Sequence, residues 1–384
     1  RDNHAWCPYC HKVWLQLEEK RVPYRVEKIP MMCYGDKPRS YLAKAPRGLL
    51  PAIELDGRFY TESSVIMQLI EDAFPDHTPM MPRGGAELSQ AKRLLGLERD
   101  LFGAWLQWLR VDDSAAVKRQ FEQVLDATNA ALERSGGPFF MGRSISLPDV
   151  VFASSLERVA ASILYYKGLS VKGGRWERIN AWFREMELRD AYKAAQSDFH
   201  THVHDLPPQI GGCLASKTPE QRAAAAEIDG TDGRSWHLPL PPLTPESLEP
   251  GTEEPLLDRL EAAAAVCHCH AGILLSNRGG SDGDLALRLV VQALAEGAEA
   301  LQPQLEEAAL SIKDTRAAAA SLRWTRDRIC VPRDMGFAAA RQLRAHLNWA
   351  ADILNPTKGW SGVPLSPYDR RDTDPVNFAA AAAA

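Results

Sequence analysis

Two cysteines near the start of the chain, Cys7 and Cys10, flank Pro8 and Tyr9 in the stretch WCPYCHK. Pro8 suits the first turn of a helix, where a missing N–H costs nothing, so Cys7 is expected at a helix N-terminus. The free backbone N–H groups and the positive helix dipole stabilise a thiolate there, which lowers the pKa of the thiol and raises its reactivity. Cys10 follows one turn later, within reach of a mixed disulfide on Cys7.

Two other interpretations of this cysteine pair stay open. One is a structural short-loop disulfide or a pair of inert thiols. The other is part of a zinc site, for which His4 and His11 are the candidate further ligands. The spacing fits no usual zinc ligand set, so no metal is expected. A CxxC at a strand-to-helix turn is instead typical of redox sites.

Composition limits the classes of protein to which the chain can belong. Its 384 residues, 45% hydrophobic and 25% charged, are typical of a globular protein with several domains. A net charge of −5 argues against nucleic-acid binding as the main task. No apolar run approaches the roughly 18 residues of a membrane span. Seven cysteines, an odd and ordinary number, favour a reducing compartment over a disulfide scaffold.

The elements around the cysteines follow the order of a thioredoxin-like α/β domain. This domain is expected over residues 1–76, with its first strand largely missing from the chain. Asp56-Gly57 is a strong signal for a hairpin turn between the strands PAIEL and RFYT. Apolar spacing predicts the other elements: a helix over 8–21, a strand over 24–29, a weak helix over 38–44 and a helix that starts at Glu62-Ser63.

Later residues give helical signals, so the expected fold class is multidomain, α/β followed by all-α. An all-helical domain is expected over 86–204, where Ser146 and Asp149 predict a capping box. A Pro/Gly-rich connector is expected over 205–252, an additional antiparallel helical bundle over 254–356, and a polar tail over 357–384. Pro207 and Pro208 are expected to break helical structure, and the predicted later helices cover 219–227, 255–276, 284–309 with an interruption near Pro303, 315–329 and 336–354.

Several of these segments together resemble a cysteine-type glutathione transferase. The resemblance covers about residues 1–205 and is carried by CPYC, LLPAIEL, the DGRFYTES junction and the helical domain. The omega and lambda classes and the glutathionyl-hydroquinone reductases are nearest in chemistry. DLPPQIGG and residues 326–354 resemble the iota class of photosynthetic organisms, in which a further helical domain follows the transferase core. The resemblance implies glutathione as cosubstrate and the plastid stroma as location, with the cytoplasm as the alternative.

The resemblance also implies a glutathione site, residue by residue. Pro51 would be cis and would present the backbone of Leu50 to the cysteinyl part of glutathione. Ser63, with the helix N-terminus, would hold the γ-glutamyl carboxylate, and Glu62 would hold the ammonium group. Lys37 would meet the glycyl carboxylate, although a solvated loop lysine is an equally good interpretation of it.

Cys10 departs from the family pattern, because most cysteine-type transferases lack a second cysteine. The implied nucleophile is Cys7, through a mixed disulfide with glutathione, and Cys10 adds a dithiol route like that of a glutaredoxin. Thiol transfer, removal of glutathione from adducts and reduction of small oxidants such as dehydroascorbate are expected rather than conjugation. The alternative is a non-catalytic structural or interaction subunit of a larger plastid assembly, with 254–356 contacting a protein partner.

Aromatic side chains are the candidates for binding the second substrate between the two domains. Tyr9 follows the nucleophile, and Trp105 and Trp108 lie on the first long helix. Tyr165 and Tyr166 come later in the same domain. Helices bury large rings for stability, so a core position is the competing interpretation for these residues.

Two histidine-rich stretches carry a weaker signal. His200, His202 and His204 alternate in DFHTHVHD and would share one face of a strand. In VCHCHAG only Cys267 and His270 share a helix face, because neighbouring helical residues point about 100° apart. Buried thiols and hydrogen-bonded histidines are expected, not metal ligands.

Overall fold

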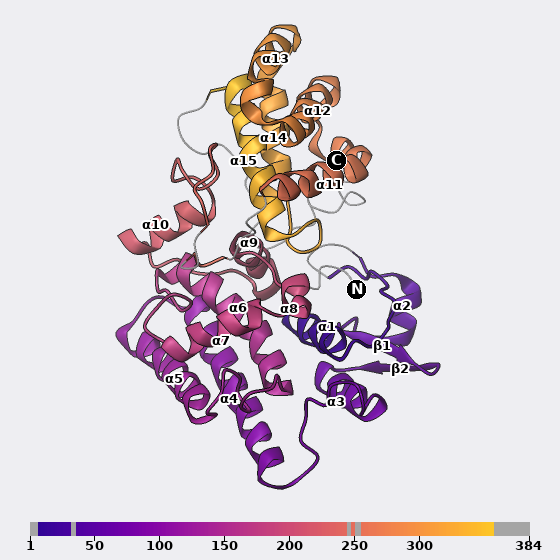
Figure 1. The fold of residues 1–384 in the computed structure, drawn as a ribbon, viewed down its shortest axis with the longest axis vertical. Coiled ribbons are helices and arrows are strands. Elements are labelled where there is room, and N and C mark those ends of the chain that lie inside the picture. The colour runs from indigo at the N-terminus through magenta and orange to yellow at the C-terminus, as the bar shows by residue number, and fades with distance from the viewer. Residues whose placement is uncertain (1–6, 32–35, 244–246, 250–254, 357–384) are drawn as a thin grey trace. The chain divides into compact units, whose positions relative to one another are not determined.

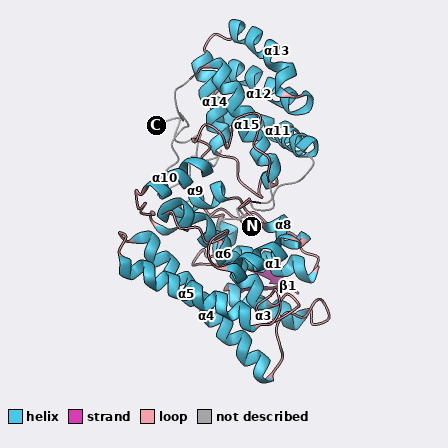
Figure 2. Cartoon of the chain, turned by 60° about the vertical axis from the view of Figure 1, so that its left-hand side comes forward, coloured by secondary structure: helices cyan, strands magenta, loops and turns pink. Residues whose placement is uncertain are grey.

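The structure is a computed structural model that describes residues 7–31, 36–243, 247–249 and 255–356. The predicted tail over 357–384 therefore lies outside the described residues. The chain divides into two compact units, residues 1–222 and 223–384. Figure 1 labels the elements of both units, and Figure 2 shows the same chain turned by 60°. Among the described helices, none combines the length and the apolar character that a membrane crossing requires.

The first unit begins with helix α1 and a β-hairpin, both as predicted. Helix α1 starts at Pro8 and ends at Arg21, which caps it in the left-handed conformation at φ 53°. The antiparallel hairpin turns at Asp56 and Gly57, whose φ values of 50° and 75° are those of a tight hairpin turn. The elements are α1 (Pro8–Lys20), α2 (Arg39–Lys44), β1 (Ala52–Leu55), β2 (Arg58–Thr61) and α3 (Ser63–Ala73).

The predicted strand over 24–29 is wrong. Residues 22–31 form no strand, and the described sheet consists of β1 and β2. A strand is defined by hydrogen bonds to a neighbouring strand, and none of the described segments forms such a ladder with this one. The alternating pattern alone therefore leaves Tyr24 and Val26 exposed.

Helix α6 is the centre of the helical part of the first unit. It packs against α1, α4 and α9. The predicted capping box at its start is present: the Asp149 carboxylate accepts hydrogen bonds from Ser146 N (2.9 Å), Phe140 N (2.9 Å) and Trp182 Nε1 (2.9 Å). The helices are α4 (Gly85–Arg110), α5 (Ala115–Arg134), α6 (Leu147–Lys167), α7 (Glu177–Glu187), α8 (Asp190–Ala195) and α9 (Phe199–Ile210).

The expectation that Pro207 and Pro208 break helical structure is wrong, because both lie inside α9. Pro207 has no N–H to donate to the carbonyl of Val203 one turn earlier. The hydroxyl of Tyr166 donates to that carbonyl instead, at 2.7 Å. Tertiary contact thus supplies the bond that the proline lacks, and the helix ends at Gly211, at φ 80°.

The helices of the second unit differ from the prediction at one point. A single helix over 284–309 with an interruption near Pro303 is predicted, but the break lies at Gly297 and Pro303 is inside a helix. Gly297 has a φ of 104°, which residues with a side chain rarely adopt. The helices are α10 (Pro219–Ile228), which begins in the first unit, α11 (Pro255–Asn277), α12 (Gly280–Glu296), α13 (Ala298–Ser311), α14 (Thr315–Asp327) and α15 (Phe337–Leu354).

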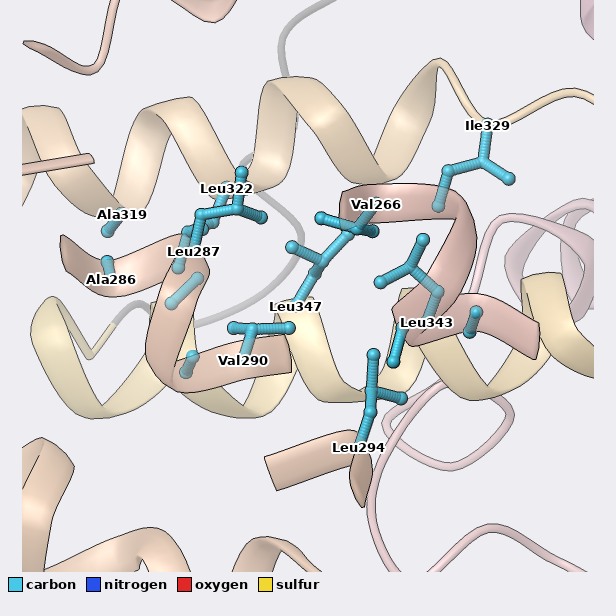
Figure 3. Packing of buried hydrophobic residues seen from close by; sticks show 14 of the residues in the cluster. Val266, Ala286, Leu287, Val290, Leu294, Ala319, Leu322, Ile329, Leu343 and Leu347 are labelled. Atoms are coloured by element: carbon cyan, nitrogen blue, oxygen red, sulfur yellow. The ribbon is translucent and has the colours of Figure 1, made fainter. Parts of the chain in front are cut away.

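Helices α11 to α15 enclose one hydrophobic cluster, seen from close by in Figure 3. Val266 of α11, Val290 of α12, Leu322 of α14 and Leu347 of α15 are all buried in it. The cluster contains only alanine, valine, leucine, isoleucine and methionine. Burial of apolar surface therefore holds these helices together.

Candidate active site

Cys7 is the N-cap of α1, as the CPYC pattern predicts. Its sulfur accepts a hydrogen bond from the backbone N–H of Cys10 at 3.3 Å, and its carbonyl accepts one from His11 N at 2.9 Å. The side chain is buried, with 6% exposed. The free N–H groups of the first helical turn therefore point at the sulfur, where they favour its negative form.

The pKa values of the two cysteines shift in opposite directions. A hydrogen bond from the Cys10 side chain, with the Cys10 backbone N–H and the charge of Arg158, lowers the pKa of Cys7 to about 7 in spite of burial. The same side-chain hydrogen bond and burial raise the pKa of Cys10 well above its usual value. Cys7 is therefore the more acidic of the two thiols, and Cys10 donates to it.

A layer of buried ionisable side chains joins α1 to α6 and α9. Arg158 Nη1 donates to the Ser154 carbonyl at 2.6 Å and lies 3.2 Å from His11 Nδ1. The Glu157 carboxylate lies 3.1 Å from His202 Nε2 and 3.9 Å from His11 Nε2. Burial, and then the charge of Arg158, lower the pKa of His202 well below its usual value, so this imidazole is neutral. The layer thus places a guanidinium charge near the thiols.

A cavity of about 780 Å³ lies beside the N-terminus of α1. Its walls come from α1, the Leu50–Pro51 turn, the start of α3, and the helices α4 and α6. The residues that line it include Pro8, Tyr9, Leu50, Pro51, Glu62 and Ser63.

The structure brings together four of the five residues that the resemblance assigns to glutathione. The Leu50–Pro51 peptide bond is cis. Ser63 is the first residue of α3, and Glu62 precedes it with a left-handed φ of 68°. The Glu62 carboxylate is exposed and lies 3.6 Å from Arg47 Nη1, a partner that the sequence did not indicate. A carboxylate and a helix N-terminus side by side offer both signs of charge to a zwitterionic ligand.

Lys37 is the exception among these five residues. Its Nζ donates to the carbonyl of Pro30 at 2.5 Å and lies 5.9 Å from the centre of the Tyr41 ring. Lys37 is not among the residues that line the 780 Å³ cavity. Cys10 lines a different cavity, of about 870 Å³, with Trp14 and Tyr41 among its other lining residues.

Comparison with known proteins assigns the sequence to a protein family. The sequence model described as "Glutathione S-transferase, N-terminal domain" matches residues 6–73. "Glutathione S-transferase DHAR2" of Arabidopsis thaliana is 30% identical over 166 residues, which cover 43% of this chain and 72% of that protein. The chain belongs to the glutathione S-transferase family.

The chain is also similar to other proteins of known sequence or structure. "Glutathione S-transferase DHAR3, chloroplastic" of Arabidopsis thaliana is 28% identical over 208 residues, covering 54% of this chain and 75% of that protein. Among solved structures, glutathione transferase Omega 3C from Trametes versicolor matches with a TM-score of 0.45 and 24% identity, over 50% of this chain and 82% of that one. The family plan, a thioredoxin-like N-terminal domain followed by a helical domain, fits the transferase over its first unit.

The predicted second-substrate aromatics of the transferase have mostly structural positions. Trp105 and Trp108 are buried, and their Nε1 atoms donate to Ser162 Oγ and Asp113 Oδ1, each at 2.8 Å. Neither they nor Tyr165 line the 780 Å³ cavity, and their assignment to a second-substrate cleft stays a prediction. Large rings gain more from burial in a helical core than from lining a wet cleft.

Among the other candidate aromatics of the transferase, Tyr9 differs in position from Tyr165 and Tyr166. Tyr9 lines the cavity and is 47% exposed. The Tyr165 ring instead packs edge-on against Tyr166, with centroids 4.8 Å apart.

The histidine-rich stretches are helical in the transferase. His200, His202 and His204 lie on α9, so His202 turns toward Glu157 while the rings of His200 and His204 lie 4.6 Å apart. On α11, Cys267 is exposed, and His270 Nε2 lies 2.7 Å from the carboxylate of Asp284.

Arg158 and Glu98 are the site residues that sequence reasoning missed. Arg158 has a signal in hindsight: the pair Glu157-Arg158 interrupts a long apolar helix, and charged residues are almost never fully buried unless they are paired. Glu98 has no such signal, because charged residues surround it on α4. Its position on the wall of the 780 Å³ cavity becomes visible only in the fold.

Proposed function

We propose that this transferase is a glutathione-dependent thiol–disulfide oxidoreductase with Cys7 as its nucleophile. The observation that carries the proposal is a thiol with a pKa of about 7, capping α1 beside the cavity that Leu50, Pro51 and Ser63 line. About half of such a thiol is thiolate at neutral pH. A cysteine at this position forms a disulfide with glutathione rather than merely activating it.

Glutathione is proposed to bind in an extended form along the Leu50–Pro51 turn. The backbone of Leu50 would pair with the cysteinyl residue. The γ-glutamyl carboxylate would meet Ser63 and the N-terminus of α3, where backbone N–H groups bind anions. The exposed Glu62 carboxylate would pair with the ammonium group. Lys37 remains the proposed partner of the glycyl carboxylate.

The proposed reaction has two thiol–disulfide exchanges. The Cys7 thiolate attacks the glutathione sulfur of a mixed disulfide, which forms Cys7–S–S–glutathione and releases the other thiol. A second glutathione then attacks the glutathione sulfur of this adduct, so oxidised glutathione leaves and Cys7 is a thiolate again. The substrate disulfide is reduced, and two glutathione units leave as the disulfide. The raised pKa of Cys10 makes it the slower nucleophile, so we propose that Cys10 serves as a donor to Cys7.

We also propose small oxidants such as dehydroascorbate as substrates, because relatives of the chain carry the name DHAR. We propose the plastid stroma as the location, since one relative is named chloroplastic. Another is named cytosolic, which makes the cytoplasm the alternative. A fluorescent fusion of the full-length natural protein distinguishes the two.

Mass spectrometry of the full chain with oxidised glutathione tests the proposed function. A one-to-one glutathione adduct is expected for the unmodified protein and for Cys10→Ser, and none is expected for Cys7→Ser. An adduct that persists in Cys7→Ser would show that Cys7 is not the nucleophile. No adduct on the unmodified protein across pH 6 to 9 removes the whole proposal.

We further propose that residues 254–356 are an additional bundle of the kind found in the iota class and serve contact with a partner. Leu256, Leu257, Leu260 and Leu275 of α11 are all exposed, which supports this role. Size fractionation of a native extract tests it, with elution at the mass of the single chain as the contrary result.

A further inference from the structure

The 780 Å³ cavity has a wall that the glutathione assignment does not use. Helix α1 contributes Tyr9 and Lys12, helix α4 contributes Glu98 and Phe102, and helix α6 contributes Ser155. The two residues from α1 are three positions apart and the two from α4 are four apart, so each pair lies on one helix face. Other residues of this wall are Leu95, Arg99, Val151 and Ser154.

Glu98 is a buried carboxyl group on this wall. Only 7% of the residue is exposed, and the hydroxyl of Ser155 donates a hydrogen bond to Glu98 Oε1. Burial raises the pKa of Glu98, while Ser155 and the charges of Lys12 and Arg99 oppose that rise. The carboxyl group therefore holds a proton more readily than a carboxyl group in water does.

A ring contact and a shared charged neighbour join the Glu98 face of α4 to α1, the helix that Cys7 caps. Tyr9 follows Cys7 by two residues, and its ring lies 6.0 Å from that of Phe102, centroid to centroid. Phe102 is one helical turn after Glu98 on α4. Lys12 carries the same link, since its pKa is lowered by burial and raised by the charges of both Glu98 and Cys7.

We propose that Glu98 is the general acid and base for the thiol that departs from the mixed disulfides of the proposed function, with its largest effect where that thiol is aliphatic. This inference rests on the proposed function, because it needs the exchange at Cys7. An aliphatic thiolate is a strong base and therefore a poor leaving group, so protonation as it departs assists the exchange.

The proton balances over the two exchanges. Cys7 thiolate attacks the glutathione sulfur, the sulfur–sulfur bond breaks, and the leaving thiolate takes the proton of Glu98. The incoming glutathione thiol then gives its proton to the Glu98 carboxylate and attacks the adduct as a thiolate. Oxidised glutathione leaves, Cys7 is again a thiolate, and Glu98 is again protonated.

The test compares two leaving groups on the full chain. The rate of adduct formation at Cys7 is measured by rapid quenching and mass spectrometry. The two substrates are the mixed disulfides of glutathione with 2-mercaptoethanol and with 2-nitro-5-thiobenzoate. Glu98→Gln is expected to slow the first roughly 100-fold, the lower end of general acid–base effects. The aromatic thiolate is stable without a proton, so its rate is expected to stay within about twofold. Glu87→Gln, an exposed carboxyl on the same helix, is the matched control, with both rates unchanged.

Each other outcome overturns a definite statement. If Glu98→Gln slows the reactions of both substrates equally, Glu98 has a structural role. If it leaves both rates as in the unmodified protein, Glu98 takes no part in proton transfer. Cys7 keeps its role in either case. No adduct from the unmodified protein removes the proposed function and this inference with it. If Glu98→Gln does not fold, Ser155→Ala serves: loss of its hydrogen bond shifts the pH profile of the 2-mercaptoethanol reaction upward, and an unshifted profile contradicts the proposal.

Discussion

The core of helices α11 to α15 and the contact of α1 with α6 differ in the residues that they bury. The first is a cluster of aliphatic side chains alone. The second encloses His11, Glu157 and Arg158, each at most 4% exposed. Burying charged groups costs stability unless they are paired, so the aliphatic core is the cheaper way to join helices. The charged layer lies where the charge of Arg158 acts on Cys7, which points to reactivity as its role.

Buried arginines of the second unit sharpen the comparison. Arg323 lies 2.8 Å from the carboxylate of Asp352, and Arg326 lies 2.8 Å from that of Asp327. These guanidinium groups have a carboxylate in direct contact. Burial lowers the pKa of Arg158, while the charges of Glu157 and of both cysteines oppose that change. A guanidinium that interacts with thiols affects chemistry as well as stability.

A large effect is expected in the aliphatic core. Leu347→Ala removes a fully buried side chain between α15 and its neighbours and is expected to lower the free energy of unfolding by about 2–5 kcal/mol. Denaturant unfolding followed by circular dichroism measures it. The alkylation rate of Cys7 serves as the control and is expected to stay the same, because the substitution lies in the other unit. A loss below about 1 kcal/mol contradicts the role assigned to this core.

Acid should weaken the second unit through His346. Burial, and then the charge of Arg259, lower the pKa of His346 to about 4. The unfolded chain takes up this proton near pH 6.5, so the contribution of His346 is full above pH 6.5 and is lost as the pH falls toward 4. The expected loss is about 3 kcal/mol. Unfolding of His346→Gln at several pH values should lack this part of the pH dependence, and superposable profiles count against it.

Local signals in the sequence were enough to predict the first helical turn of the candidate site and the β-hairpin. Pro8 positions the helix that Cys7 caps, and Asp56-Gly57 fixes the hairpin. These features depend on residues a few positions apart, so a single sequence contains them. The strand over 24–29 failed because a strand needs a neighbour, which local alternation does not supply. Pro207 failed as a helix breaker because Tyr166, remote in sequence, satisfies Val203.

The site residues that were missed depend on contacts across long separations. Arg158 is far from Cys7 in the chain, and only the packing of α1 against α6 brings their charges together. For Trp105 and Trp108 the sequence leaves a cleft and a core position open, because ring-rich helices line clefts and cores alike. Burial decides between the two, and it is a property of the fold.

Arg158 offers the direct test of the charged layer. Arg158→Met keeps much of the length and removes the charge, so the pKa of Cys7 should rise and its alkylation by iodoacetamide at pH 7 should slow roughly tenfold. The unmodified protein should give a rate profile with its midpoint near pH 7. Arg158→Lys is the matched control, because it keeps a positive charge and should shift the profile less. If Met and Lys shift it equally, packing rather than charge sets the reactivity of Cys7.

The smallest effect on the free energy of unfolding is expected for a solvent-exposed ion pair. Lys44 and Glu54 form an ion pair at 3.0 Å with about half of each side chain exposed. Exposed pairs contribute about 0.2–1 kcal/mol, so Lys44→Ala should change the free energy of unfolding by less than about 1 kcal/mol, and less still at high salt. Lys20 and Glu71, 3.1 Å apart and buried, are the matched comparison, and Lys20→Ala should cost about 3–5 kcal/mol because it leaves a buried carboxylate. Equal costs for the two lysines would mean that burial does not decide what a charge contributes here, and the contrast between the charged layer and the aliphatic core would lose its physical basis.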